Sequence, residues 1–434
     1  MQRILFIVVF FAIFEPMSLS AQQIDDGLAK VFYAGAYYDV PPAGGNETSK
    51  YLVGPLVRKV SNFSGDELYT YVEDAMRANT AFSTAVAVSF GADAQLGKDG
   101  GGLAVYIPRA QHDQVKYSVP GAPDIYLTTI SISVALDVFT DKAAESRFLQ
   151  LEGLYSRLLV GEQSVKTRAP LDDAALASHY ASLFNQTLSD LLNDAANDHL
   201  GRQREKANAM FQLSEFIMPK GDKFPAEIAQ LIGSGSDVER LKLSLEFLHL
   251  INKTVSDEFN KKSHRDIALL SPPTAWAVSN VGELLAKRLV GKSRGGSVKI
   301  RFFADPNAEQ AVDTRGGGKM GPVAYTVKPA LARASTKVLA ESEIQKAKIF
   351  GVQLLARIYL PQFGQAPKWV PVTVPEEART AKGMGGADID DVAGMERVTT
   401  REIAMSAMRS AAKDLAPGLV DLMRNIADNR VENR

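Results

Sequence analysis

Cysteine is absent from this sequence of 434 residues. The chain therefore forms no disulfide bonds, and catalysis by a cysteine nucleophile is excluded. The chain also has no cysteine that could be lipid-modified at a leader cleavage site, so we expect no lipid anchor. At this length, and with 46% hydrophobic residues, the chain can bury a core without disulfides.

An excess of charge of one sign is also lacking. The sequence has 49 Lys and Arg residues against 50 Asp and Glu residues, a formal net charge of -1. A domain that binds nucleic acid over a broad surface carries a strongly basic excess. We therefore expect no nucleic-acid partner.

Motifs for phosphate binding are incomplete. The stretch most similar to a phosphate-binding loop consists of Gly316, Gly317, Gly318 and Lys319. Asp313 stands where the P-loop has its first glycine, and Met320 stands where it has Ser or Thr. Backbone amides here can form an anion nest, although a flexible turn explains the glycines as well.

Metal-binding and catalytic motifs are incomplete too. The five histidines do not have the H-E-x-x-H spacing. No nucleophile elbow is predicted, because the G-x-S-x-G match at residues 291–295 follows a predicted helix, whereas an elbow follows a strand. The acidic stretch Asp388–Asp391 lacks the remaining ligands of a calcium loop. We expect no cofactor and no metal ion, and we assign no catalytic residue. The paired carboxylates of a glycosidase cannot be located before the fold is known.

The first residues have the layout of a secretory signal peptide. A basic residue at Arg3 precedes an apolar run over residues 4–14, and Glu15-Pro16 ends this run before the small residues at 18–21. The apolar run is shorter than the roughly 20 residues of a spanning helix. We predict a signal peptide at residues 1–21 and an exported protein, periplasmic or extracellular in a bacterium.

Long strands with alternating apolar residues dominate two regions. Residues 126–141 alternate Ile, Val and Leu with Thr, Ser and Asp, and residues 349–360 show the same period of two. Each is expected to return as a second strand, at residues 147–160 and 368–374. Further strands are predicted at residues 30–39, 82–90, 103–107 and 298–303.

Helices are predicted from apolar stripes and capping residues. Their ranges are residues 67–79, 172–199, 274–290 and a last helix from residue 400. Thr399 and Glu402 have the spacing of a capping box at the start of the last helix, and Pro417 is expected to restart it. The Gly- and Asp-rich residues 382–394 are interpreted as a linker.

The central segment, residues 203–262, is interpreted as helical. Its last helix repeats apolar residues at a spacing of three and four, with Asn252 among them. The face proposed for a helical contact consists of Leu241, Leu245, Leu248, Asn252 and Val255. A second apolar face at Leu243, Phe247 and Leu250 favours packing between neighbouring elements of the same chain, with self-association as the alternative.

The sequence therefore predicts an α+β protein. It would consist of two similar mixed α/β modules, with antiparallel-rich sheets covered by long helices, joined by a helical connector. The predicted boundaries are a first module at residues 22–202, the connector at 203–262 and a second module at 263–434. The shared order of elements suggests an internal duplication, although packing logic alone also produces such an order.

By element order the modules resemble the envelope α/β modules of the curli secretion channel and of penicillin-binding-protein activator lipoproteins. Those families depend on a lipidated N-terminal cysteine, which this sequence lacks, and no functional residue is carried over. The resemblance implies an architecture in the bacterial envelope.

The leading functional hypothesis is a non-catalytic envelope protein that binds a protein partner, self-associates or assists assembly of an envelope complex. One alternative is a hydrolase acting on an envelope polymer. Another is a subunit of an oligomeric outer-membrane pore, in which membrane contact arises through oligomerisation. Charged residues within the strands, such as Arg157 and Arg357, favour a sheet covered by helices over one that faces lipid.

Overall fold

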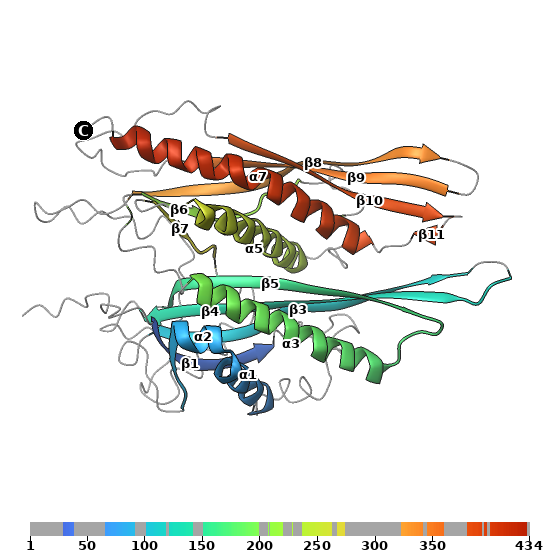
Figure 1. The fold of residues 1–434 in the computed structure, drawn as a ribbon, viewed down its shortest axis with the longest axis horizontal. Coiled ribbons are helices and arrows are strands. Elements are labelled where there is room, and N and C mark those ends of the chain that lie inside the picture. The colour runs from blue at the N-terminus through green and yellow to red at the C-terminus, as the bar shows by residue number, and fades with distance from the viewer. Residues whose placement is uncertain are drawn as a thin grey trace, which may run out of the picture.

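The protein combines helices with two mixed sheets, as the computed structural model shows (Figure 1). The structure describes residues 29–38, 66–91, 101–118, 121–141, 151–198, 207, 209–219, 228, 237–262, 267–273, 323–341, 345–359, 380–392, 395–396 and 400–431. This arrangement confirms the predicted α+β class.

The first sheet has five strands in the order β2-β1-β3-β4-β5. Its strands are β1 (Ala29–Tyr38), β2 (Val86–Ser89), β3 (Gly101–Tyr117), β4 (Ile125–Asp141) and β5 (Leu151–Thr167). β1 is parallel to β2 and β3, whereas β3, β4 and β5 are antiparallel neighbours. One face of this sheet is covered by α1 (Asp66–Ala78), α2 (Thr80–Ala85) and α3 (Asp173–Asp198).

The second sheet has six strands in the order β11-β10-β9-β8-β6-β7. Its strands are β6 (Ala209–Leu213), β7 (Ile267–Leu270), β8 (Val323–Glu341), β9 (Gln345–Tyr359), β10 (Thr380–Val392) and β11 (Met395–Glu396). β6 is parallel to β7 and β8, and β8, β9 and β10 are antiparallel neighbours. The helices α5 (Asp237–Lys261) and α7 (Thr400–Val431) pack on one face.

The described parts of the two sheets follow the same path. Each begins with a strand, continues through helix to a parallel edge strand, then adds three antiparallel strands and ends in a long helix. Both also have an irregularity at a similar place, between Tyr106 and Arg109 in β3 and between Leu331 and Arg333 in β8. This correspondence supports the duplication, which nonetheless stays a prediction.

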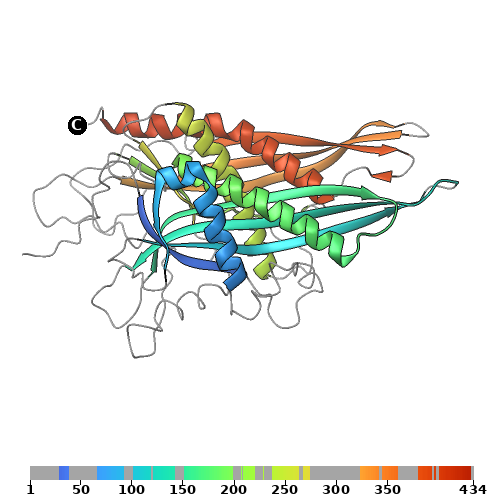
Figure 2. The same ribbon diagram turned by 60° about the horizontal axis from the view of Figure 1, so that its bottom comes forward.

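The molecule is built as alternating layers of helix and sheet. The layer of α1, α2 and α3 lies on the first sheet, and α5 lies between the first sheet and the second (Figures 1 and 2). One core fills the space between α3 and the first sheet. The other core joins the opposite face of the first sheet to α5, α7 and the second sheet.

The apolar sides of the two alternating strands are buried beneath helices of the same chain. In β4 the buried apolar residues belong to the core that contains α3, and in β9 they belong to the core that contains α7. These residues are Ile130, Ile132, Val134, Leu136 and Val138 in β4, and Phe350, Val352, Leu354, Ala356 and Ile358 in β9. Among the described helices, none is long and apolar enough to cross a membrane.

The strand predicted at residues 82–90 was wrong in its first half. Residues 80–85 form the helix α2, because the side chain of Asn79 caps it by accepting a hydrogen bond from the backbone N–H of Phe82 at 2.9 Å. Phe82 is buried under this cap, and only Val86–Ser89 remain extended.

The linker predicted at residues 382–394 was also wrong, because residues 380–392 form strand β10. The strand pairs with β9 along its length and packs under α7. The register pairs Gly383 and Gly385 with Leu354 and Val352 of β9, which are buried in the core that contains α7. The glycines and aspartates of this segment, which are typical of a flexible linker, therefore lie in a strand that packs under a helix.

Three further differences concern the second half of the chain. Within the predicted helical connector, residues 209–213 form β6 of the second sheet. Strand β8, which contains Pro329, was not predicted. α7 runs without a break through Pro417 instead of restarting there. Pro417 lies on the exposed side of this helix, and its neighbours Leu415, Ala416 and Leu419 are buried.

Several predictions fall on residues outside the described part of the chain. They are the signal peptide at 1–21, the helix at 274–290, the strands at 298–303 and 368–374, and the glycine-rich residues 316–319. The domain boundaries likewise remain predictions.

Candidate functional site

Polar and charged side chains are concentrated where the first sheet meets α5 and α7. We call this contact the junction, and it consists of side chains from β3, β4, β5, α5 and α7. The buried members of the junction include Arg109, Ser133, Arg157, Glu246, His249, Asn252 and Arg401. Burying such groups is costly unless they are paired, so their partners determine what the junction can do.

Glu246 of α5 is placed between two arginines. Its Oε2 atom lies 3.3 Å from Nη1 of Arg109 and 3.5 Å from Nη2 of Arg401. Ser133 of β4 donates a hydrogen bond to its Oε1 atom. The carboxylate is 1% exposed. Burial lowers the pKa of Arg109, while the nearby Glu246 opposes this change.

A second carboxylate links α7 to β5. Glu162 lies 2.9 Å from Nη2 of Arg409 and 3.4 Å from Nε of Arg401, and Ser164 of β5 donates a hydrogen bond to Glu402 at 3.0 Å. Arg401 therefore lies between Glu162 and Glu246. This chain of ion pairs ties the first sheet to α5 and α7 at the same time.

His249 of α5 is held in one tautomer. Its Nδ1 atom accepts a hydrogen bond from the backbone N–H of Leu158 at 3.1 Å. Its Nε2 atom lies 3.2 Å from the carbonyl oxygen of Pro273, so this nitrogen carries the proton and donates it. The ring is fully buried, and burial lowers its pKa from 6.5 to about 3. A histidine fixed in this way acts as a structural connector.

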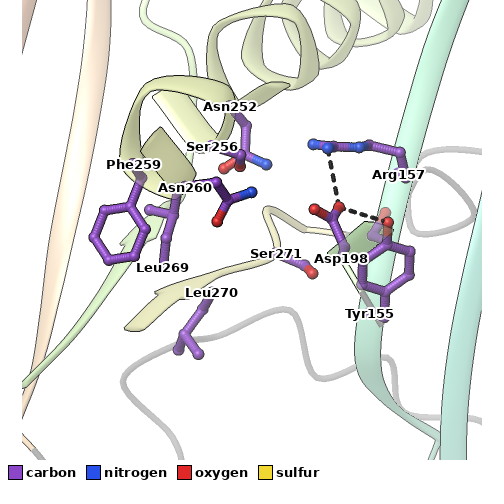
Figure 3. Close-up of a pocket in the computed structure, with 11 residues that line it drawn as sticks. Tyr155, Arg157, Asp198, Asn252, Ser256, Phe259, Asn260, Leu269, Leu270 and Ser271 are labelled. Atoms are coloured by element: carbon purple, nitrogen blue, oxygen red, sulfur yellow. Dashed lines mark hydrogen bonds and ion pairs between the residues drawn. The ribbon is translucent and has the colours of Figure 1, made fainter. Parts of the chain in front are cut away.

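A small polar pocket lies at one end of the junction (Figure 3). Its empty volume is about 440 Å³, part of which is open to solvent. It is lined by Tyr155, Ser156, Arg157, Asp198, Asn252, Ser256, Phe259, Asn260, Leu269, Leu270 and Ser271. The lining therefore comes from β5, the end of α3, the last turns of α5, and β7 with the residue that follows it.

Asp198 connects two residues of β5 within this pocket. Its Oδ2 atom lies 2.9 Å from Nη2 of Arg157 and accepts a 2.9 Å hydrogen bond from the hydroxyl of Tyr155, as Figure 3 shows. Burial raises the pKa of Asp198, although Arg157 and Tyr155 favour its ionised form. Burial also raises the pKa of Tyr155, so its hydroxyl keeps its proton.

The remaining polar groups of the pocket belong to uncharged side chains. Asn252 is 4% exposed, and its Oδ1 atom accepts no hydrogen bond from the described residues. Ser256 and Ser271 offer hydroxyl groups nearby. No group of His, Asp and Glu side chains in the described ranges is arranged to hold a metal ion.

The residues of the proposed helical contact face differ in their exposure to solvent. Leu245, Leu248, Asn252 and Val255 are buried within the same chain, whereas Leu241 is 54% exposed. The second apolar face of α5 is also packed inside the chain, at Leu243 and Phe247. The possible anion nest at Gly316, Gly317, Gly318 and Lys319 lies outside the described residues.

Sequence reasoning did not identify the junction as a site. Arg109, Glu246 and Arg401 are far apart in the chain and no motif connects them. Two signals were present: Arg157 interrupts an otherwise apolar strand, and Asn252 occupies an apolar position in the repeat of α5. Both residues line the pocket.

The opposite side of the second sheet presents a different surface. We call the face of β8, β9 and β10 that points away from α5 and α7 the outer face. Cross-strand pairs place Arg333 beside Gln353 and Met384, and Arg357 beside Lys328. Its exposed members include Arg333, Arg357, Tyr359, Lys382 and Met384. Tyr359 is 40% and Met384 67% exposed.

Comparisons with known proteins give distant likenesses. No protein-family model matches the sequence, and no curated protein matches it at a significant level. A solved structure of a DUF330-family protein from Xanthomonas campestris is 14% identical over 40% of this chain and 84% of its own, with a TM-score of 0.22.

Two further solved structures also overlap 40% of this chain. One, a putative neuraminyllactose-binding hemagglutinin homolog from Helicobacter pylori, is 8% identical over 86% of its length, with a TM-score of 0.24. The other, a minor lipoprotein from Acinetobacter baumannii, is 11% identical over 92% of its length, with a TM-score of 0.18. TM-scores of this size support no statement about the function of this chain.

Proposed function

We propose that this chain is an exported, non-catalytic protein of a bacterial envelope that binds a protein partner through the outer face of its second sheet. The observation that carries the proposal is the unequal covering of two sheets with the same topology. In the first sheet the face opposite α3 is buried, with Ala104, Tyr106, Ala135, Phe139 and Leu158 in the core shared with α5.

The corresponding face of the second sheet has exposed residues that combine cations with large apolar groups. Arg333, Arg357 and Lys382 are exposed there beside Tyr359 and Met384. A protein interface commonly uses aromatic, methionine and arginine side chains together. Arginine and lysine stems also cover apolar surface while their charged ends bind carboxylates. The outer face therefore suits a protein surface with acidic side chains.

The alternatives have less support. A hydrolase of an envelope polymer needs two carboxylates about 5–9 Å apart in a groove. Of the described residues that line the pocket, Asp198 supplies a carboxylate, and it is paired with Arg157. A pore built from the two hairpins would expose the apolar sides of β4 and β9, which are buried beneath α3 and α7.

Site-specific photo-crosslinking in the native envelope tests the proposal. A photoreactive residue is placed at Tyr359 or Met384 on the outer face, and at exposed Lys413 of α7 as a control. We expect a defined protein adduct from the outer face and none from Lys413. Mass spectrometry then identifies the partner. The proposal fails if neither outer-face position gives a protein adduct.

A further inference from the structure

We propose that the partner bound by the outer face is a second copy of this chain, which docks its α1–α3 layer there. This inference rests on the proposed function and names the partner. The interaction would join two different surfaces, the outer face of one copy and the exposed side of α1, α2 and α3 of the next. The layers of helix and sheet would then continue from one molecule into its neighbour.

The chain already makes a contact of this kind once within itself. The face of the first sheet opposite α3 receives the helix layer of the second half, α5 and α7. In that contact the backbone of β5 donates a hydrogen bond to His249 of α5. Side chains of β3 and β4 donate hydrogen bonds to Glu246 of the same helix. A helix layer on the back of a sheet is therefore a stable packing for this architecture.

The matching irregularities in β3 and β8 place an arginine at the same position in each sheet. After the irregularity in β3, Arg109 pairs across the sheet with Ser133, and both contact Glu246 of α5. After the irregularity in β8, Arg333 pairs with Gln353. Arg333 thus occupies the position in the second sheet that Arg109 occupies in the first.

The environment of these two arginines differs in one respect. Arg109 is 6% exposed and paired with Glu246. Arg333 is exposed and makes no hydrogen bond or ion pair with any described residue. A helix that carries a carboxylate would give Arg333 the partner that α5 gives Arg109.

The two ends of the stack carry opposite charges. The outer face carries Arg333, Arg357 and Lys382, together with Lys328, which is paired with Glu215 at 3.0 Å. α3 contains no Lys or Arg, and in α1 the one basic residue, Arg77, is paired with Glu73 at 2.7 Å. Asp74 of α1 and Asp173 and Asp190 of α3 are exposed. Opposite charges on the two surfaces favour association and set its orientation.

The exposed side of α3 also has a shape that can lie against a sheet. Its solvent-facing residues are mostly short and polar, at Ser178, Ser182, Gln186, Ser189 and Asn193. Hydrogen bonds fix the other two helices to α3, because Tyr71 of α1 donates to Asn185 and Asn79, the N-cap of α2, donates to Asn193. The three helices are therefore joined into one layer. Contact between unlike surfaces of identical chains produces a ring or an open filament.

The test uses the mature chain, residues 22–434, in two charge-reversed forms. The first form, Arg333→Glu with Lys382→Glu, reverses charge on the outer face. The second form, Asp74→Lys with Asp190→Lys, reverses charge on the helix layer. Lys413→Glu on the exposed side of α7 serves as the matched control. Sedimentation velocity measures self-association from about 1 to 100 µM at low salt and at about 0.5 M salt.

We expect the wild type and Lys413→Glu to associate with increasing concentration at low salt, and to dissociate at high salt. Each charge-reversed form alone should associate at least about tenfold more weakly. An equimolar mixture of the two forms should recover association, because every contact between unlike forms is again complementary. Thermal unfolding of each variant shows that it is folded.

The inference is overturned if the folded wild type remains monomeric, or if the mixture does not recover association. A monomeric wild type that still gives an outer-face adduct with another protein would leave the proposed function standing. A third arm measures binding to vesicles that contain anionic lipid. Salt-sensitive binding of the monomeric wild type that is lost in the outer-face variant would replace the second copy with a lipid surface.

Discussion

Buried charges connect the two halves of this protein at the level of single residues. Glu246 is the shared partner of Arg109 and Arg401 and is 1% exposed. A buried ion pair is weak evidence for net stability, because desolvation opposes the Coulomb attraction. The loss of one member is nevertheless costly, since the remaining charges stay buried without compensation.

Glu246→Gln should therefore lower the free energy of unfolding by about 3–5 kcal/mol. Glutamine keeps the shape but removes the charge that Arg109 and Arg401 share. Urea unfolding of the wild type and the variant measures the change. A triple variant with Met at 109 and 401 and Leu at 246 should lower the free energy of unfolding much less, because no charge stays buried without a partner. If Glu246→Gln were as stable as the wild type, the ion pairs would not hold the halves together.

His249 makes the stability of the protein depend on pH. Its folded-state pKa of about 3 lies below its ordinary value of 6.5, so only the unfolded chain binds a proton between these values. Stability from this group is complete above pH 6.5 and decreases by about 1.4 kcal/mol per pH unit as the pH falls toward 3.

His249→Gln should remove this dependence. Glutamine can accept the hydrogen bond from Leu158 and donate one to Pro273, but it does not titrate. Between pH 6.5 and 5.0 the wild type should lose about 2 kcal/mol more stability than the variant. Urea unfolding at the two pH values measures the difference. His179→Gln on α3 is the matched control, and equal losses in all three proteins would contradict the prediction.

At the scale of elements, glycine determines how closely the long helices approach the sheets. A Cβ atom built on Gly161 of β5 would lie 2.0 Å from Oγ1 of Thr187 in α3. The sheet register pairs Gly161 with Ile132, and Gly385 of β10 with Val352. A glycine thus lies in the last long strand of each sheet, beneath the helix that follows it.

Gly161→Ala should lower the free energy of unfolding by about 1–3 kcal/mol, because the added methyl group displaces α3. Adding Thr187→Ala should recover part of this loss, since it removes the atom that the methyl group meets. Gly418→Ala in α7 is the control: nothing lies within 4 Å of its Cβ position. That substitution should raise stability by about 0.5–1 kcal/mol. Additive losses in the double variant would rule out the clash.

The elements that the sequence predicts well are those whose own side chains determine their structure. The strict alternation in β4 and β9 and the apolar stripes of α3 and α5 are visible in single segments. Each such segment must bury one side, so the period of its apolar residues predicts its type. The α+β class and the covering of the strands by helices follow from these elements.

The elements that were missed depend on neighbours distant in sequence. β10 is a strand because β9 pairs with it and α7 covers it, although its glycines and aspartates are typical of a linker. The junction was missed for a related reason. Arg109, Glu246 and Arg401 meet only after the second half of the chain packs on the first, and a charged residue within one segment does not indicate its partner.

At the scale of the whole molecule, the stacked layers make the two halves unequal. The first sheet is covered on both faces only because α5 and α7 belong to the same chain. The second sheet has helices on one face and an exposed outer face. Removal of one half therefore has different consequences for the other.

Residues 22–202 produced alone should expose Tyr106, Phe139 and Leu158, which are buried against α5 in the full chain. This fragment should bind a fluorescent hydrophobic dye and aggregate, since the newly exposed patch is apolar. Residues 203–434 keep their own helices and should bind less dye per molecule. Dye fluorescence and light scattering of the two fragments and the full chain measure this difference. Equal dye binding by both fragments would contradict the layered arrangement.

The central position of α5 also determines how the protein melts. α5 packs against both sheets in one shared core. If α5 unfolds with one sheet, it therefore exposes the apolar face of the other sheet to water. The two halves should consequently melt in one cooperative transition, with equal calorimetric and van't Hoff enthalpies.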